Sequence, residues 1–257
     1  MKKFFIIKLI CFTFFCFSIK AQESKSLIVF AEPNLSIVLT ELVRLYSQEH
    51  NVITSINFNS PADLIGDIDM GDPADVVITA HKEAIETLKL KGLVDVYNIG
   101  NIAKDSINLV TSIKNSQIPT NLLDGDINMD QALSILNERR STLILDNYGS
   151  SSGRYSGDYL RNLNLGKFSV FTKLAEDRSS IVTSVLSDDN HYALLLSTQI
   201  KNKSGLRVLA SQESDITYKL LVIAGDNMDT ARKFLRFLES NQEARQIFAT
   251  NGLNSAF

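Results

Sequence analysis

The sequence is poor in the residues that several classes of functional site require. Its 257 residues include no tryptophan, four prolines, three histidines and two cysteines. It therefore offers neither an aromatic platform for nucleic-acid bases nor a proline-rich linker. His50, His81 and His191 are far apart in the sequence and match no metal-ligand pattern, so we expect no metal site.

The N-terminal segment has the three-part pattern of a secretory signal. Residues 1–3 give a positively charged start, residues 9–19 are mostly apolar, and Ala21 is a small residue that suits cleavage. The apolar run is too short for a membrane-spanning helix, and a retained N-terminal anchor is the alternative. We predict an exported, periplasmic protein whose residues 1–21 are a signal peptide removed by cleavage after Ala21.

Removal of the signal peptide changes the composition in two ways. Cys11 and Cys16 leave with it, so the mature chain would have no thiol nucleophile, disulfide or thiolate metal ligand. The segment also holds four lysines and no acid, so the net charge changes from 26 − 29 = −3 to 22 − 29 = −7. Phosphate neutralisation needs clustered Lys and Arg, so we expect no nucleic-acid partner.

Motifs of several enzyme classes are also missing. The sequence has no G-x-x-x-x-G-K-[ST] phosphate loop and no G-x-G-x-x-G fingerprint. The acidic residues within 63–75 are spread along a predicted helix and loop, as is typical of exposed surface and helix caps. We therefore interpret the chain as a protein that is not an enzyme, with no catalytic residue and no cofactor. An exported hydrolase with an unrecognised carboxylate site is an alternative, because folding can bring distant carboxylates together.

Strands and helices are predicted to alternate along the first part of the mature chain. Short apolar runs predict strands at 27–31, 52–58 and 74–80. Asn34 is expected to cap the first helix, Ser60 and Pro61 to start the second, and residues 81–91 to form the third. This β-α-β-α-β-α order predicts a parallel sheet covered by helices.

A second α/β block follows without a linker. Strands are predicted at 106–112, 142–146, 192–196 and 217–224, and helices at 129–139, before 162, at 177–186 and within 228–248, where a break falls near 240–241. The two blocks predict an α/β fold of two lobes joined by crossovers near 104–108 and 212–217. We expect residues 22–106 with 215–257 in lobe I and residues 107–214 in lobe II. A cleft between two lobes is a common small-molecule site.

Hydroxyl-rich junctions lead into several of the predicted helices. They are Asn34, Ser60, the run Ser150–Gly153, and Arg178 with the two serines that follow it. Each places free backbone N–H groups and a short polar side chain at the positive end of a helix dipole, which is a ready anion site. Because Ser and Asn are also the preferred N-cap residues, these junctions are equally compatible with ordinary capping.

The sequence resembles the periplasmic molybdate-binding proteins of ABC importers, within the type II solute-binding fold. The resemblance is carried in order by the segments Val29–Ala31, Phe58–Ser60, Gly71–Ala80, Ser152–Leu160, Ala175–Asp177 and Phe248–Leu253, and it spans nearly all of the mature chain. It implies two α/β lobes, each a mixed sheet flanked by helices, with the ligand cleft between them. It also implies a monomer that binds molybdate, tungstate or a related tetrahedral oxyanion and delivers it to a membrane permease.

The resemblance also implies a set of ligand-binding residues that donate neutral hydrogen bonds. The positions that correspond to the family's contacts, or lie beside them, are Asn34, Ser60, Ser151, Ser152, Arg178 and Ser197. The chain departs from the family at Leu196, where a tyrosine is usual, and at Glu32, where a small residue is usual. A carboxylate near a bound dianion is repulsive unless it turns away or pairs, for example with Arg178. The alternatives are therefore a different oxyanion, a ligand with a positive group opposite Glu32, or an adhesion module that has lost transport.

Overall fold

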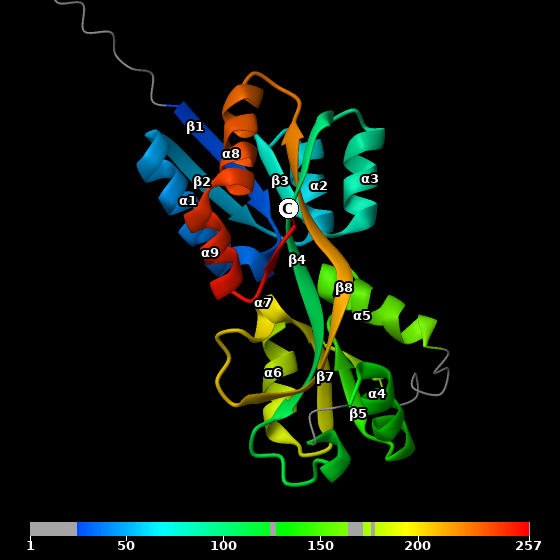
Figure 1. Cartoon of the computed structure of the whole chain (residues 1–257). Coiled ribbons are helices and arrows are strands. Elements are labelled where there is room, and N and C mark those ends of the chain that lie inside the picture. Colours follow the sequence, from blue (N-terminus) through cyan, green and yellow to red (C-terminus); the bar gives the residue numbers. More distant parts are fainter. Residues whose placement is uncertain (1–24, 124–126, 164–171, 176–177, 257) are drawn as a thin grey trace, which may run out of the picture.

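In a computed structural model of the chain, two α/β lobes share one continuous sheet (Figure 1). The structure describes residues 25–123, 127–163, 172–175 and 178–256. The predicted signal peptide, residues 1–21, lies outside the described residues. Within the described ranges, none of the helices is both long enough and apolar enough to cross a membrane.

The described part of the chain forms a nine-stranded mixed sheet. Its strands are β1 (Lys25–Ala31), β2 (Val52–Phe58), β3 (Val76–Thr79), β4 (Val94–Ser112), β5 (Thr142–Leu145), β6 (Thr172–Leu174), β7 (His191–Leu196), β8 (Leu206–Ile223) and β9 (Asn254–Ser255). Their order is β2-β1-β3-β8-β4-β7-β5-β6, with β9 added beside β4. The β1, β2 and β3 pairings are parallel, whereas β8 and β4 are antiparallel to their neighbours in the centre.

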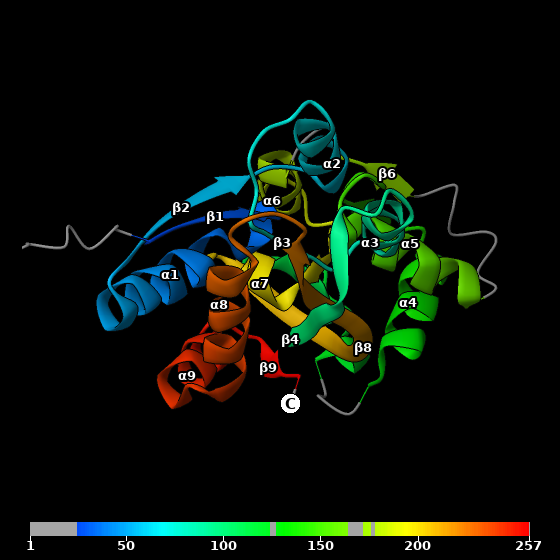
Figure 2. The same cartoon turned by 90° about the horizontal axis from the view of Figure 1, so that it is seen from above.

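Helices connect these strands and cover the sheet. The helices are η1 (Pro33–Leu35), α1 (Ser36–His50), α2 (Pro61–Asp69), α3 (Lys82–Leu90), η2 (Thr120–Leu122), α4 (Met129–Glu138), α5 (Ser151–Asn162), α6 (Arg178–Ser187), α7 (Ser197–Ile200), α8 (Met228–Ser240) and α9 (Gln242–Thr250). Seen from above, α1, α8 and α9 lie on one side of β1–β3, and α2 and α3 lie on the other (Figure 2). Both faces of the parallel strands are therefore covered, which explains their continuous apolar sequences.

Two long strands hold the lobes together. The first lobe consists of β1, β2 and β3 with α1–α3, α8 and α9, and the second lobe consists of β5, β6 and β7 with α4–α6. The strands β4 and β8 pair along almost their whole lengths and run from one lobe into the other (Figure 1). Their register shifts between Asp105 and Ser106, opposite Ile216 and Glu213, at the level where the lobes meet. A register shift disrupts the ladder locally and lets a strand bend.

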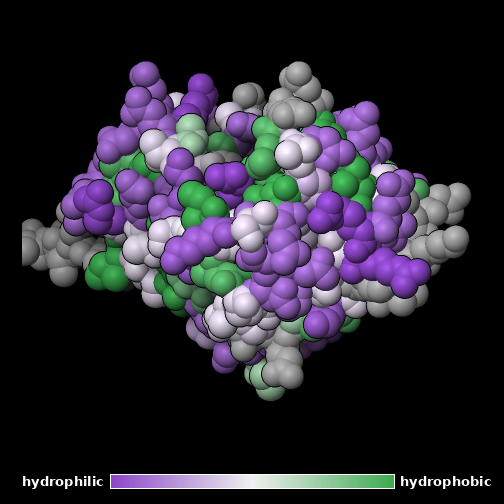
Figure 3. Space-filling model, turned by 90° about the horizontal axis from the view of Figure 1, so that it is seen from below, coloured by the Kyte–Doolittle hydropathy of each residue, from purple (hydrophilic) through white to green (hydrophobic). Residues whose placement is uncertain are grey.

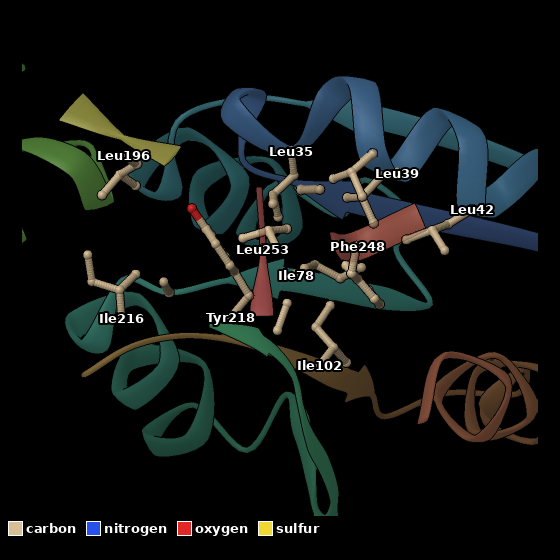
Figure 4. Close-up of a cluster of buried hydrophobic side chains, with 14 of the residues drawn as sticks. Leu35, Leu39, Leu42, Ile78, Ile102, Leu196, Ile216, Tyr218, Phe248 and Leu253 are labelled. Atoms are coloured by element: carbon tan, nitrogen blue, oxygen red, sulfur yellow. The ribbon is translucent and has the colours of Figure 1, made fainter. Parts of the chain in front are cut away.

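A large apolar core lies beneath α1, α8 and α9. Figure 4 shows part of it, including Leu35 from η1, Leu39 from α1, Ile102 from β4 and Phe248 from α9. Tyr218 is fully buried in this cluster, and its hydroxyl accepts a hydrogen bond from Asn34. Burial of large apolar side chains is the main stabilising contribution to such a fold.

The outer surface of the second lobe carries both hydrophilic and hydrophobic residues. Seen from below, hydrophilic side chains surround smaller hydrophobic areas (Figure 3). Exposed apolar side chains in this lobe include Ile113, Leu186 and Val208. Exposed apolar residues interspersed with polar ones are normal on a protein surface.

The predicted helix starts are partly confirmed. Ser60 is the N-cap of α2 and accepts a hydrogen bond from the N–H of Asp63. Asn34 does not cap α1, which corrects the prediction. It lies inside the short helix η1, and Leu35 precedes α1 without a side-chain cap. Pro33 explains the difference, because it is the first residue of η1. The helical turn therefore starts one residue before Asn34, and Glu32 is its N-cap.

Gly153 is required where α5 packs on the loop after β5. A Cβ atom at this position would overlap the carbonyl groups of Asp146 and Asn147, which are backbone atoms and cannot turn aside. We expect Gly153→Ala to lower the free energy of unfolding by about 1–3 kcal/mol, measured by urea titration. Gly66→Ala is the matched control, because a Cβ in the middle of α2 would meet no atom within 4 Å. It should raise stability by up to about 1 kcal/mol, and equal destabilisation by both would contradict this packing.

Candidate ligand-binding site

The centre of the site is a buried carboxylate between the lobes. Glu32 is only 1% exposed, and its Oε1 accepts three hydrogen bonds. The hydroxyl of Thr79 donates at 2.5 Å, the backbone N–H of Ala80 at 2.8 Å and the hydroxyl of Ser151 at 2.7 Å. Thr79 ends β3 of the first lobe and Ala80 follows it, whereas Ser151 begins α5 of the second. These four residues are called the carboxylate cradle below.

Neutral dipoles stabilise this negative charge. Among the described residues, Glu32 makes no salt bridge with a lysine, arginine or histidine. Instead it lies where three helices begin, since Glu32 itself precedes η1, Ala80 precedes the N-cap of α3, and Ser151 is the first residue of α5. Helix N-termini carry partial positive charge and unpaired N–H groups, so their convergence favours an anion here. The cradle is therefore built to hold an oxygen anion.

Asn34 belongs to a second polar network beside the cradle. Its amide donates to the hydroxyl of Tyr218 and, at 3.3 Å, to the hydroxyl of Thr198. The Thr198 hydroxyl donates in turn to the carboxylate of Asp105 at 2.8 Å, and the Tyr218 hydroxyl approaches the same carboxylate at 3.4 Å. The Oδ1 atom of Asn34 is buried and has no hydrogen-bond partner in the described part of the chain. An unpaired buried acceptor is costly, so this oxygen is available to a donor group of a ligand, whereas both N–H groups of the amide are already engaged.

Asp105 fixes the network at the point where β4 passes between the lobes. It also accepts from the N–H groups of Ser106 at 2.8 Å and of Ser197 at 2.9 Å, and so occupies the N-terminus of α7. Burial raises the pKa of Asp105 to about 6, although the surrounding hydrogen bonds oppose this rise. Burial, followed by the charges of Asp105 and Glu32, raises the pKa of Tyr218 well above its ordinary value, so its hydroxyl stays protonated.

Ser152 takes part in a third network inside the second lobe. Its hydroxyl donates to Oε1 of Gln199 at 2.7 Å, and Nε2 of Gln199 donates to the buried carboxylate of Asp146 at 3.2 Å. This network joins the start of α5 to α7. The side chain of Ser152 is thereby engaged, but α5 provides no acceptor for the N–H groups of Ser151 and Ser152 in its first turn.

None of the described contacts joins the other predicted residues to the Glu32 carboxylate. Ser60 caps α2, where its hydroxyl donates to Asp63 at 2.5 Å. The hydroxyl of Ser197 accepts from Asn108 at 3.0 Å. Arg178 starts α6, but its side chain lies outside the described residues, so its suggested pairing with Glu32 is not among the described contacts. The structure thus brings Ser151 into the cradle, places Asn34 and Ser197 in the adjoining network, and leaves Ser60 as a helix cap.

Further contacts close the cleft on the side of α3 and α5. The hydroxyl of Tyr155 on α5 donates to the carbonyl oxygen of Ala80 at 3.1 Å. Arg154 forms a salt bridge with Glu83 on α3, and the ammonium of Lys82 lies 5.4 Å from the centre of the Tyr155 ring. These contacts join the two lobes at the edge of the cradle.

Sequence reasoning missed several of these residues. Thr79 was visible only as the end of a family motif, and Asp105 and Tyr218 carried no local signal of their own. It also missed that Gly149, Ser151 and Gly153 have the G-x-S-x-G spacing of a nucleophile elbow. In the structure, however, the Ser151 hydroxyl donates to Glu32 and not to a histidine, so it lacks the base that this motif normally uses.

Comparison with protein families shows which family the chain belongs to. Residues 27–254 match the model of the bacterial extracellular solute-binding proteins, and the chain belongs to this family. Proteins of this family capture a small solute for an ABC importer and its permease. A search of curated proteins finds no match.

Solved structures share the two-lobed fold. A substrate-binding domain from Clostridium difficile, assigned to a molybdenum ABC transporter, is 22% identical with a TM-score of 0.72, over 91% of this chain and 100% of that one. The tungstate ABC transporter structure from Geobacter sulfurreducens is 16% identical with a TM-score of 0.70, over 87% and 97%. Peb3 of Campylobacter jejuni with L-phospholactate bound is 14% identical with a TM-score of 0.64, over 89% and 99%. At these identities the likeness establishes the fold.

The raised pKa of Asp105 predicts a pH-dependent stability. The carboxyl holds its proton more tightly in the folded protein than in the unfolded chain, so it stabilises the fold at low pH. That contribution is lost as the pH rises through about 6. Between pH 5 and 7.5 we expect it to fall by about 1.4 kcal/mol.

Asp105→Asn should abolish this contribution while it keeps the acceptor for Ser106 and Ser197. Urea titration at both pH values should then show that the stability of the variant falls by about 1.4 kcal/mol less than that of the wild type. Asp72→Asn, which changes an exposed acid, is the control. Equal pH dependence in all three proteins would contradict the assignment.

Proposed function

We propose that this protein captures a small tetrahedral oxyanion, such as molybdate or tungstate, in the cleft between its lobes and delivers it to the permease of an ABC importer. The observation that carries this proposal is the carboxylate cradle, where O–H and N–H donors from both lobes meet one buried negative charge that has no cationic partner among the described residues. Fixed dipoles of this kind can hold an oxyanion as well as a carboxylate. The fold shared with molybdenum and tungstate transport proteins supports the same ligand class.

The ligand competes with Glu32 in this proposal. An oxygen of the ligand accepts from Thr79, Ala80 and Ser151 in place of Oε1, and the carboxylate moves aside. Two negative charges a few ångströms apart repel each other by several kcal/mol in a partly buried site, so both cannot occupy the cradle at once. Glu32 therefore weakens binding but also holds the empty donors in place, because it satisfies groups that would otherwise be buried without a partner.

The remaining predicted residues support the ligand from around the cradle. The N–H of Ser152 donates directly, the Asn34 amide donates after it releases the hydroxyl of Thr198, and Arg178 adds a positive charge at the start of α6. Ser60 orients the start of α2, and Ser197 holds Asp105 through its N–H. A tetrahedral anion accepts from donors in several directions, which is why contacts from both lobes are useful.

Capture proceeds by closure of the lobes. We place lobe I at residues 22–106 and 215–257 and lobe II at residues 107–214, with the hinge at the register shift in β4 and β8. A ligand that contacts both lobes stabilises the closed form, which the permease then recognises. The mature protein acts in the periplasm as a monomer, after loss of residues 1–21, and neither catalyses a reaction nor binds nucleic acid.

A ligand with a positive group is the second candidate. It is favoured by the carboxylate of Glu32, which is buried and has no cationic partner among the described residues. An amine or guanidine would supply that partner directly, and buried charges are normally paired. In this case Glu32 would be a ligand-binding residue and not a competitor.

Glu32→Gln separates the two candidates. It removes the negative charge and keeps the shape of the side chain, so the variant should bind molybdate, tungstate or phosphate at least tenfold more tightly than the wild type. Thermal shifts and calorimetric titrations with these oxyanions, sulfate and small amines measure the change. A loss of amine binding, with no gain for any oxyanion, would reject the oxyanion proposal in favour of the second candidate.

Ser151→Ala tests the contribution of the second lobe. Loss of this hydroxyl removes one of the donors to the buried anion, so oxyanion affinity should fall by about tenfold. Ser134→Ala is the control, since that hydroxyl donates within α4 to the carbonyl of Asp130. Titration calorimetry measures both, and unchanged affinity in Ser151→Ala would mean that the ligand does not use the cradle.

A further inference from the structure

A pocket of about 460 Å³ opens between the lobes next to the carboxylate cradle. The start of α3, the strands β4 and β8, and α5 form its walls. Its polar lining comes mainly from Lys82, Asn101, Tyr155, Thr217 and Lys219. The volume is within the range of small-molecule sites and exceeds what a single inorganic oxyanion needs.

The lining of this pocket is positively charged. Lys82 and Lys219 both contribute to it, and neither forms a salt bridge in the part of the chain that the structure describes. Glu86 is the acidic residue in the lining, and its carboxylate already pairs with Lys89 at 2.9 Å. Two lysines that face a concave surface without acidic partners favour an anionic group.

The pocket is continuous with the cradle. Lys219 on β8 is paired directly with Thr79 on β3, so their side chains project from the same face of the sheet, with Cβ atoms about 5 Å apart. Ala80 also belongs to both sites, because its N–H donates to Glu32 while its carbonyl accepts from Tyr155, and both Ala80 and Tyr155 line the pocket. A ligand that starts in the cradle can therefore extend toward the two lysines.

We propose that the pocket holds the second anionic group of a small organic dianion, such as a dicarboxylate or a phosphorylated hydroxy acid, whose first anionic group occupies the cradle. This inference rests on the proposed function, because the first group uses the same donors. Lys219 pairs with the second group, Lys82 adds charge at the entrance beside Tyr155, and Asn101 and Thr217 supply neutral hydrogen bonds.

Calorimetric titration of the mature protein with inorganic phosphate, succinate and phosphoglycolate tests the pocket. We expect the wild type to bind at least one of the two organic dianions at least tenfold more tightly than phosphate. Lys219→Met keeps the length of the side chain and removes its charge, so it should weaken binding of that dianion by about tenfold and leave phosphate unchanged. Lys82→Met should weaken it by severalfold. Lys114→Met, in the exposed turn after β4, removes the same charge as a control.

The outcomes separate the pocket from the cradle. If phosphate binds but the organic dianions bind no better, or if Lys219→Met weakens all three ligands equally, the pocket is not the second subsite and the proposed function stands. If organic dianions bind in a lysine-dependent way and no inorganic oxyanion binds, the pocket is supported and the oxyanion specificity is overturned. If none of these anions binds, the pocket proposal fails, and the proposed function fails with it only if molybdate and tungstate do not bind either. Equal melting temperatures of the variants confirm that they are folded.

Discussion

The structure depends on how a single buried carboxylate is held between two lobes. The Oε1 atom of Glu32 accepts from the end of β3 and from the start of α5, where Ser151 lies 119 residues further along the sequence than Glu32 itself. No basic residue of the described chain pairs with it, and the stabilisation comes from hydrogen bonds and helix dipoles. Such a site favours negatively charged oxygen atoms. In the proposed function, either the Glu32 carboxylate or an oxygen of a captured ligand can accept from these donors.

In the proposed closure, the second network links the cleft to the strands that cross between the lobes. Asp105 and Tyr218 lie on β4 and β8 close to the register shift, and both connect to Asn34 or to the start of α7. A change in the position of Asn34 would therefore alter hydrogen bonds at the crossover itself. The raised pKa values of both groups reflect the low polarity of this junction, where removal of a hydrogen-bond partner is costly.

Much of the fold could be predicted from the sequence, because the spacing of apolar residues indicates which faces of a helix or strand are buried. The parallel strands of the first lobe are continuous apolar runs, and the helix that follows β2 has a clear start signal at Ser60. The first part of β4 and the first part of β8 were missed. Both alternate polar and apolar residues over irregular, bulged stretches, and only their pairing with each other makes them strands.

The site was less predictable, because it depends on contacts over long separations. The resemblance to molybdate-binding proteins located Ser151 and drew attention to Glu32, but it could not show that the two are hydrogen-bonded. Lys219 and Thr79 become neighbours only through the antiparallel pairing of β3 with β8. Local sequence therefore indicated which loops face the cleft, whereas the order of strands determined which side chains meet there.

The most direct test of this account is a crystal structure of the mature protein grown with tungstate, whose anomalous scattering locates the anion. We predict a peak within hydrogen-bonding distance of the Thr79 and Ser151 hydroxyls and of the Ala80 N–H, with the Glu32 side chain displaced from the cradle. A tungstate ion bound elsewhere in the cleft, while the Glu32 carboxylate keeps all three of its donors, would contradict the central claim.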